Sequence, residues 1–314
     1  MKILTLGVWA FGFALLTHIS RKHPDTYLYA YEKDHTSVAY MKENGYHPFF
    51  FPGVPVPKNI EFVNDFRGIL PSIDVVLLVI PNQFIESMIS EIRAFLKKGV
   101  IIVNLSKWID NGTLHTVSET LATSLTGIDY TYAVLSGWMI AQELVDGTQL
   151  WADIWISESA ISGVLREIFE TPQFQVRFTS EYRNVELYWA LKNIIALYIG
   201  FLEWKWVGFS SLGYFLCTLL IELRILLVKL WGSDSIDFSS FSLGGDIIAT
   251  CFGKSRNRYL WNLVWSWMSV PEALEKLRSE KKHAEWYETL RWLKSLIQWD
   301  ERLIEFQKIV TIFL

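Results

Sequence analysis

The sequence has 314 residues, which predicts two domains at the usual size of roughly 100–200 residues each. Its 29 basic and 33 acidic side chains leave a net charge of −4, so the chain lacks the basic field that nucleic-acid binding requires. Two cysteines exclude a disulfide framework and fit a reducing compartment, and six scattered histidines without zinc-ligand spacing predict no metal site.

Strands and helices are predicted to alternate over the first 180 residues. Apolar runs predict strands at 2–7, 26–32, 59–64, 74–80, 100–105, 131–136, 152–157 and 174–179. Helices are predicted at 10–22, 34–44, 83–97, 113–125, 139–146 and 160–170. Prolines between residues 47 and 57 predict an irregular loop there. This alternation is typical of a Rossmann-type, doubly wound parallel sheet.

Beyond residue 180 the pattern becomes helical. Helices are predicted at 182–230, 246–267, 271–279 and 283–313, so we expect domains at 1–180 and 181–314, the second all-helical. Residues 207–221 are uncharged and apolar, but they are fewer than the ~20 residues that span a bilayer. A buried helix is the favoured interpretation, and a membrane helix is the alternative.

The first predicted strand ends in a glycine turn. Gly7, Trp9 and Gly12 have the spacing of G-x-G-x-x-G, whose glycines allow a tight turn, close approach of a pyrophosphate and close helix packing. Trp9 breaks the motif at its middle position. Glu32 follows the second strand, where a carboxylate would bind the ribose hydroxyls of a dinucleotide. This turn alone is a weak indication of cofactor binding.

More specific motifs follow along the chain. They are HPFFFPGVPVPKNI from residue 47, IPNQ from 80, SKWI from 106, AVLSG from 133, VELYWALKN from 185, GDIIATC from 245, SRNR from 255 and EW at 285. In this order and spacing they resemble the NAD(P)-dependent glycerol-3-phosphate dehydrogenase family over nearly the whole chain. The resemblance implies a dinucleotide-binding domain, a helical substrate domain with the active site in the cleft between them, and the interconversion of dihydroxyacetone phosphate and sn-glycerol 3-phosphate with NAD(P)H.

The resemblance also assigns roles to residues. Lys192 would donate a proton to the ketone oxygen, Lys107 would be a second cation there, and Asp246 would orient both lysines. The residues implied to hold the substrate are Asn193, Thr250, Arg256, Asn257, Ser136 and Gly137, with Arg256 gripping the phosphate. Those implied to hold the cofactor are Gly7, Trp9, Ala10, Phe11, Gly12, Glu32, Pro81, Lys107, Ala141, Arg256 and Glu285.

The cofactor and the setting follow from the same resemblance. Glu32 would repel a 2′-phosphate and favours NAD, while the adjacent Lys33 leaves NADP open. The implied protein is cytoplasmic, acts on a small phosphorylated substrate for phospholipid synthesis, is not inserted stably in a membrane and can form a homodimer. The alternatives are another hydroxyacid-type dehydrogenase of the same architecture and a cofactor-free pseudoenzyme or binding relative.

Tryptophan is abnormally frequent, with 15 residues against 18 glycines. It replaces glycine of the family clearly at Trp9, Trp108, Trp189 and Trp286, and less certainly at Trp231, Trp261, Trp265, Trp267 and Trp299. Glycine is chosen for positive φ or for its missing side chain, and tryptophan offers neither. We hypothesise that a glycine codon, most simply UGA, is rendered as tryptophan. The competing interpretation keeps the indoles and predicts weak cofactor binding or none.

Overall fold

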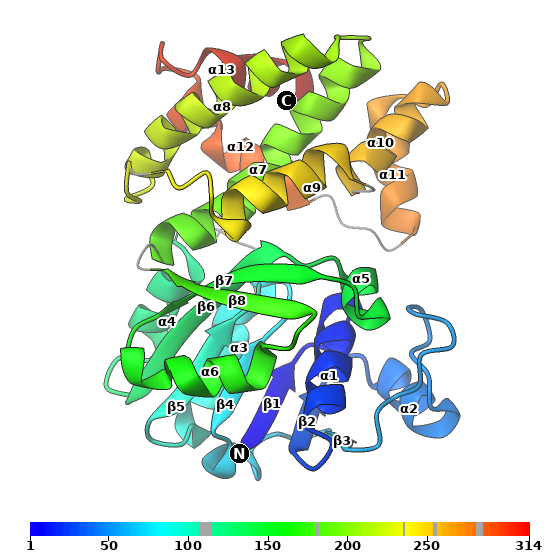
Figure 1. Ribbon diagram of the computed structural model, residues 1–314, viewed down its shortest axis with the longest axis vertical. Helices are drawn as coiled ribbons and strands as arrows, with labels where there is room; N and C mark the ends of the chain where they lie inside the picture. Colours follow the sequence, from blue (N-terminus) through cyan, green and yellow to red (C-terminus); the bar gives the residue numbers. More distant parts are fainter. Residues whose placement is uncertain (107–114, 180–181, 235, 254–255, 281–284) are drawn as a thin grey trace. The chain divides into compact units, whose positions relative to one another are not determined.

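The computed structural model describes residues 1–106, 115–179, 182–234, 236–253, 256–280 and 285–314 (Figure 1). Within these ranges the side chains of residues 82, 182, 189–190, 256–258, 265 and 285–288 are not described. The described residues form two compact units, which divide between Tyr182 and Arg183.

The first unit contains an eight-stranded sheet. Its strands are β1 (Lys2–Leu6), β2 (Tyr27–Tyr31), β3 (Ile60–Phe62), β4 (Val75–Leu78), β5 (Val100–Asn104), β6 (Tyr130–Trp138), β7 (Leu150–Ile156) and β8 (Phe174–Thr179). The spatial order is β3-β2-β1-β4-β5-β6-β7-β8, so the direction of winding reverses at β1. Ligands of open α/β sheets bind at the carboxyl ends of strands beside such a reversal, which makes the end of β1 the place to look for a site.

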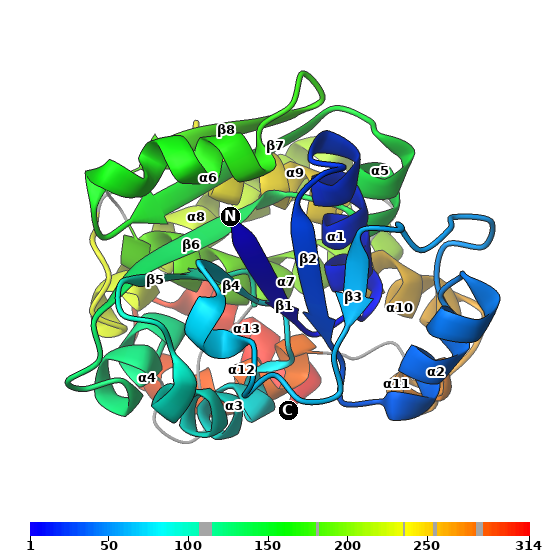
Figure 2. The ribbon, with the colours of Figure 1, turned by 90° about the horizontal axis from the view of Figure 1, so that it is seen from below.

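Helices cover both faces of this sheet (Figure 2). They are α1 (Ala10–Lys22), α2 (His35–Asn44), α3 (Ile85–Ile92), α4 (Val117–Ser124), α5 (Ala141–Asp146) and α6 (Ser162–Phe169). Helix α1 packs against α5 and α6, whereas α3 packs against α4. The central strands are apolar and buried on both sides, as in β4, because helices lie above and below them.

The predicted doubly wound sheet is confirmed, but one of its strand pairs is not parallel. Strand β7 runs antiparallel to β6, with Ser136 opposite Asp153, and β8 runs parallel to β7. Residues 139–149 join β6 to β7, and so short a connection cannot provide the crossover of a dozen or more residues that a parallel pair needs. The remaining strand pairs of the sheet are parallel, as predicted.

The second unit is helical. Its described elements are α7 (Tyr182–Trp204), α8 (Phe209–Lys229), a π-helical turn (Phe241–Gly245), α9 (Asp246–Phe252), α10 (Arg256–Trp265), α11 (Val270–Ser279), α12 (Glu285–Ile297) and α13 (Ile304–Phe313). Three predicted helices are therefore wrong in length, because each divides into two. The breaks follow Trp204, Phe252 and Ile297.

Helices α7 and α8 are long and apolar enough to cross a membrane by length and composition alone. In α7, 88% of the apolar window is buried within the structure, which is typical of a core helix. In α8 the share is 33%, because one side of the helix packs through residues such as Leu219 and Leu223 while the other side is exposed.

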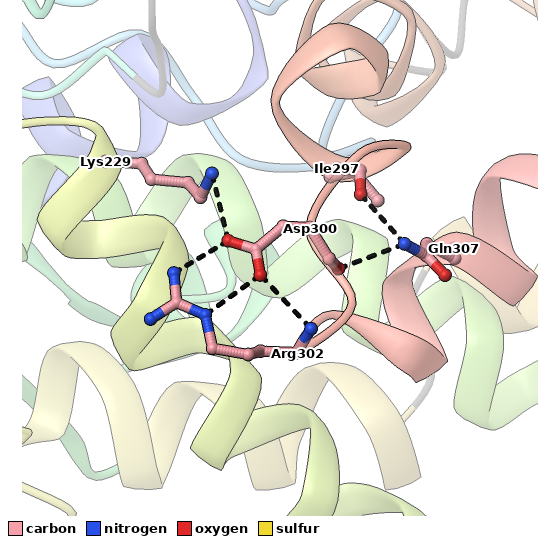
Figure 3. Close-up of polar contacts among 5 residues, drawn as sticks. All are labelled: Lys229, Ile297, Asp300, Arg302 and Gln307. Atoms are coloured by element: carbon pink, nitrogen blue, oxygen red, sulfur yellow. Dashed lines mark hydrogen bonds and ion pairs between the residues drawn. The ribbon is translucent and has the colours of Figure 1, made fainter.

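A cluster of polar side chains lies at the connection between α12 and α13 (Figure 3). The Asp300 carboxylate accepts hydrogen bonds from the Arg302 guanidinium at 2.8 and 2.9 Å and pairs with the Lys229 ammonium at 3.0 Å. The Gln307 amide donates to the carbonyl oxygens of Ile297 and Asp300. The bonds from Arg302 and then Lys229 hold the pKa of Asp300 well below its usual range. The ion pair between Lys229 and Asp300 thereby links the end of α8 to the α12–α13 connection.

Candidate active site

The turn after β1 has the backbone geometry of a dinucleotide-binding turn. Gly7 has φ +98°, and a Cβ there would lie 2.5 Å from the carbonyl oxygen of Val79. A Cβ on Gly12 would lie 2.1 Å from the carbonyl oxygen of Gly7. Glycine is therefore required at both positions. The chain enters α1 directly from this turn, so the first backbone N–H groups of the helix, at Ala10 and Phe11, can face an anion.

Glu32 lies beside this turn. Its Oε2 accepts the backbone N–H of Val8 at 2.8 Å, and its Oε1 accepts that of Asp34 at 3.2 Å. The carboxylate is thus fixed next to the end of β1, where the sequence predicted a ribose-binding group. The adjacent Lys33 places its ammonium 5.4 Å from the centre of the Phe84 ring.

Trp9 occupies the middle position of the turn, where the dinucleotide-binding motif has glycine. It is the N-cap residue of α1 in an extended conformation, with no side-chain cap. Its indole packs against the 47–50 loop, with ring centroids 4.9 Å apart for Phe50 and 5.8 Å apart for Phe49. Interference of this indole with a bound pyrophosphate remains a prediction.

His47 is a residue of this region whose role the sequence did not reveal. Its Nδ1 accepts the backbone N–H groups of Phe49 and Phe50, so its Nε2 donates to the carbonyl oxygen of Val8 at 3.2 Å. Burial lowers the pKa of His47 and favours this neutral form. The imidazole thus links the proline-rich loop to the turn after β1 by hydrogen bonds. Its position at the start of the HPFFFPG motif was the signal available in the sequence.

The carboxyl ends of β4 and β5 are held together by Ser106. Its single hydroxyl hydrogen is shared between the carbonyl oxygens of Leu78 and Ile80, 3.1 and 2.9 Å from Oγ, and its N–H donates to Asn104 Oδ1 at 2.9 Å. Pro81 follows this edge and is exposed. Lys107, which comes next after Ser106, lies outside the described residues, so its role as the second cation remains a prediction.

Ser136 and Gly137 lie on β6, within the sheet. Ser136 is fully buried, and its hydroxyl has no hydrogen-bond partner among the described residues. A Cβ on Gly137 would lie 2.6 Å from Cα of Ala152, so close approach of β6 and β7 explains this glycine. Ala141 begins α5 and packs against the core of the first unit. Substrate or cofactor contact by these three residues remains a prediction.

Three predicted residues of the second unit come together. The Lys192 ammonium, on α7, forms an ion pair with Asp246 Oδ2 on α9, and the two side chains are 3% and 6% exposed. The other oxygen of Asp246 accepts the hydroxyl of Thr250 at 3.2 Å, one helical turn further along α9. Asn193, the neighbour of Lys192, is partly buried. One buried carboxylate therefore orients both an ammonium and a hydroxyl.

The turn before α9 fixes the position of Asp246. Ser240 accepts the N–H of Leu243 and begins a π-helical turn, a feature that is frequent at functional sites. Gly244 is required in this turn, because a Cβ there would lie 2.0 Å from the carbonyl oxygen of Phe238. Gly244 thus allows the close approach of two backbone segments before Asp246, which the sequence motif alone did not explain.

Other predicted residues are only partly described. Arg256 and Asn257 begin α10, and Glu285 begins α12, but their side chains lie outside the described part of the chain. Contacts of these three residues with phosphate or cofactor therefore remain predictions. Among the described residues there is no group of three or more His, Cys, Asp or Glu side chains that could hold a metal ion.

Comparisons with known proteins place these features in one family. Residues 2–159 match the model of the NAD-dependent glycerol-3-phosphate dehydrogenase N-terminus, and residues 181–311 match that of its C-terminus. The NAD(P)+ glycerol-3-phosphate dehydrogenase of Nitratidesulfovibrio vulgaris (strain DP4) is 32% identical over 82% of this chain and 78% of the relative. That of Geobacter metallireducens is 29% identical over 88% of this chain and 82% of the relative.

A solved structure shares the fold. The glycerol-3-phosphate dehydrogenase of Coxiella burnetii superposes with a TM-score of 0.84 at 22% identity, covering 100% of this chain and 95% of the other. The sequence matches identify the family, and the shared fold, the glycine turn and the ion-paired Lys192 agree with it. The chain belongs to the NAD-dependent glycerol-3-phosphate dehydrogenases.

Proposed function

We propose that Lys192 is the proton donor in the reaction of this family, the interconversion of dihydroxyacetone phosphate and sn-glycerol 3-phosphate with NAD or NADP. The chain is an NAD(P)-dependent oxidoreductase by its membership of the family. The observation that carries the role of Lys192 is its burial in an ion pair with Asp246. A lysine side chain is almost never fully buried unless it is paired, because transfer of an unpaired charge out of water costs several kcal/mol of free energy.

The chemistry of ketone reduction explains why an ammonium belongs at this place. The ketone oxygen gains negative charge as the carbon is reduced, so a nearby cation stabilises it and a proton must reach it. An ammonium does both. Asp246 holds the Lys192 ammonium in one position, and Thr250, bonded to the same carboxylate, offers its hydroxyl oxygen beside it. We assign the binding of substrate hydroxyls to Thr250 and Asn193, and that of the phosphate to Arg256 and Asn257.

The first unit supplies the groups that would hold the dinucleotide. The amides at the start of α1 suit the pyrophosphate, and Glu32 suits the ribose hydroxyls, so Gly7, Gly12 and Glu32 fit the cofactor. Trp9 does not fit it. When bound, the nicotinamide supplies the hydride, and the chain contributes position and charge. A carboxylate at Glu32 supports a preference for NAD over NADP.

Substitution of Lys192 tests this assignment. We expect Lys192→Met to lower kcat for dihydroxyacetone phosphate reduction by about 100-fold or more, the usual contribution of a positioned acid. The KM for NADH should stay near the wild-type value, because the turn after β1 is untouched. Lys205→Met, at an exposed lysine just after α7, is the matched control and should keep full activity. Normal kcat in Lys192→Met would refute the role of Lys192.

We further propose that the protein works in the cytoplasm, feeds phospholipid synthesis and forms a homodimer. An exposed apolar stripe on α8, formed by Tyr214, Ile221 and Val228 at 65%, 63% and 53% exposure, supports association with a second copy. The opposite side of α8 packs in the core of its own unit, and buried Glu222 lies within the helix, which argues against insertion in a membrane. Sedimentation equilibrium tests the dimer, and a monomer at micromolar concentration would contradict it.

A further inference from the structure

Three helices of the second unit, α7, α8 and α10, end in the same hydrogen-bonded motif. In each, the N–H of one residue bonds to the carbonyl oxygen three residues back, and the next N–H bonds to the oxygen five residues back. These pairs are Trp206 to Glu203 with Val207 to Leu202, Trp231 to Val228 with Gly232 to Leu227, and Trp267 to Val264 with Met268 to Leu263. This is the Schellman motif, in which the residue directly after the C-cap takes the left-handed conformation and is usually glycine.

Tryptophan occupies that left-handed position in all three helices. The φ angles are +61° at Trp206, +62° at Trp231 and +69° at Trp267. For a bulky residue with a Cβ this conformation is strained and rare. Among the described residues, the only other one besides glycine with positive φ is Phe51. Tryptophan is 15 of the 314 residues, so its share of these positions is far above its share of the chain.

Helices of the first unit show the residue that this chain otherwise uses there. Helix α5 ends in the same pair of bonds, from Gly147 to Leu144 and from Thr148 to Glu143, with φ +71° at Gly147. The C-cap residue of helix α2 is Gly45, with φ +73°. The same backbone geometry thus carries glycine in one unit and tryptophan in the other.

The indoles at these helix ends gain little from packing. Trp206, Trp231 and Trp267 are 80%, 74% and 98% exposed. Trp261 is different, because it is 5% exposed and its Nε1 donates to the carbonyl oxygen of Leu197 at 2.8 Å. Burial and this bond suit a genuine tryptophan, so Trp261 does not belong among the replaced glycines.

We propose that positions 206, 231 and 267 are glycine in the protein that its own cell makes, because a glycine codon has been rendered as tryptophan in this sequence. The sequence hypothesis included Trp231 and Trp267, and backbone geometry adds Trp206. The proposal does not depend on catalysis, because none of these positions lies in the candidate active site. The same codon at position 9 would return glycine to the middle of the dinucleotide turn.

Mass spectrometry of the native protein tests the proposal directly. Peptides from protein purified from its own cells should carry glycine at positions 206, 231 and 267, and each should lack the mass of an indolylmethyl group. Tryptophan at these three positions would overturn the proposal.

Recombinant protein made with tryptophan codons tests the physical argument independently. Trp206→Gly, Trp231→Gly and Trp267→Gly should each raise Tm by about 2 °C, since relief of left-handed strain outweighs the extra chain entropy that glycine loses. Trp299→Gly is the matched control, because Trp299 is 82% exposed without positive φ, and it should give no rise. Gly147→Trp should lower Tm by a similar amount. If none of the three tryptophan-to-glycine variants raises Tm, the argument from strain is refuted.

Discussion

Removing either partner of the Lys192–Asp246 pair should cost far more stability than removing both. The two side chains are 3% and 6% exposed, so deletion of one leaves an uncompensated charge in the core of the second unit. Such single deletions typically cost about 3–5 kcal/mol of unfolding free energy, whereas apolar replacement of both partners is often neutral or stabilising. We expect about 3–5 kcal/mol for Lys192→Met and for Asp246→Leu, and less than about 2 kcal/mol for the double variant.

Urea unfolding followed by circular dichroism measures these free energies, and a double-mutant cycle isolates the interaction. NADH oxidation assays on the same preparations separate stability from catalysis. The double variant should regain stability and remain inactive, because it has lost the proton donor. A double variant as unstable as the worse single variant would show that the pair is not the source of the cost. Activity in that variant would show that another group donates the proton.

Three further predictions concern other parts of the chain. Trp9→Gly should raise the affinity for NADH by about tenfold or more in calorimetric titration, since a side chain at this position would compete with the pyrophosphate for space, and unchanged affinity would refute this. Burial lowers the pKa of His18 from 6.5, so the unfolded chain binds more protons and stability should fall as pH drops below 6.5. His18→Gln, which can keep the bond to the Phe169 carbonyl, should flatten this dependence in urea unfolding, and an equally steep slope would contradict it. Glu222→Ala should cost about 1–3 kcal/mol, because the carboxylate accepts two backbone N–H groups at the start of α13, while Glu222→Gln should cost less in the same assay.

The strands could be predicted from the sequence, because each is a short apolar run bounded by turn residues. The direction of β7 could not, since an apolar run reads the same in either direction and only the short 139–149 connection constrains it. Helix ends were the weakest prediction. The predicted helix at 182–230 continued through Trp206 because tryptophan gives no stop signal, whereas glycine at that position would have marked the end of α7.

The candidate site was predictable only through the family motifs. Lys192 and Asp246 are 54 positions apart, and nothing in either local sequence says that they meet. Their contact depends on the π-helical turn and on the close backbone approach at Gly244, both of which are properties of the folded chain. Burial of Lys192 was indicated by its apolar neighbours on α7, and the structure shows that burial.

The tryptophans with positive φ after α7, α8 and α10 have a consequence for other proteins of the same organism. The hydrogen bonds at a helix end set the backbone torsions of the residue that follows. A left-handed φ there therefore indicates glycine even where the sequence assigns another amino acid. Other proteins of the same genome should then show tryptophan enriched at left-handed residues after their helices, and counting these residues would diagnose the misread glycine codon without any peptide being sequenced.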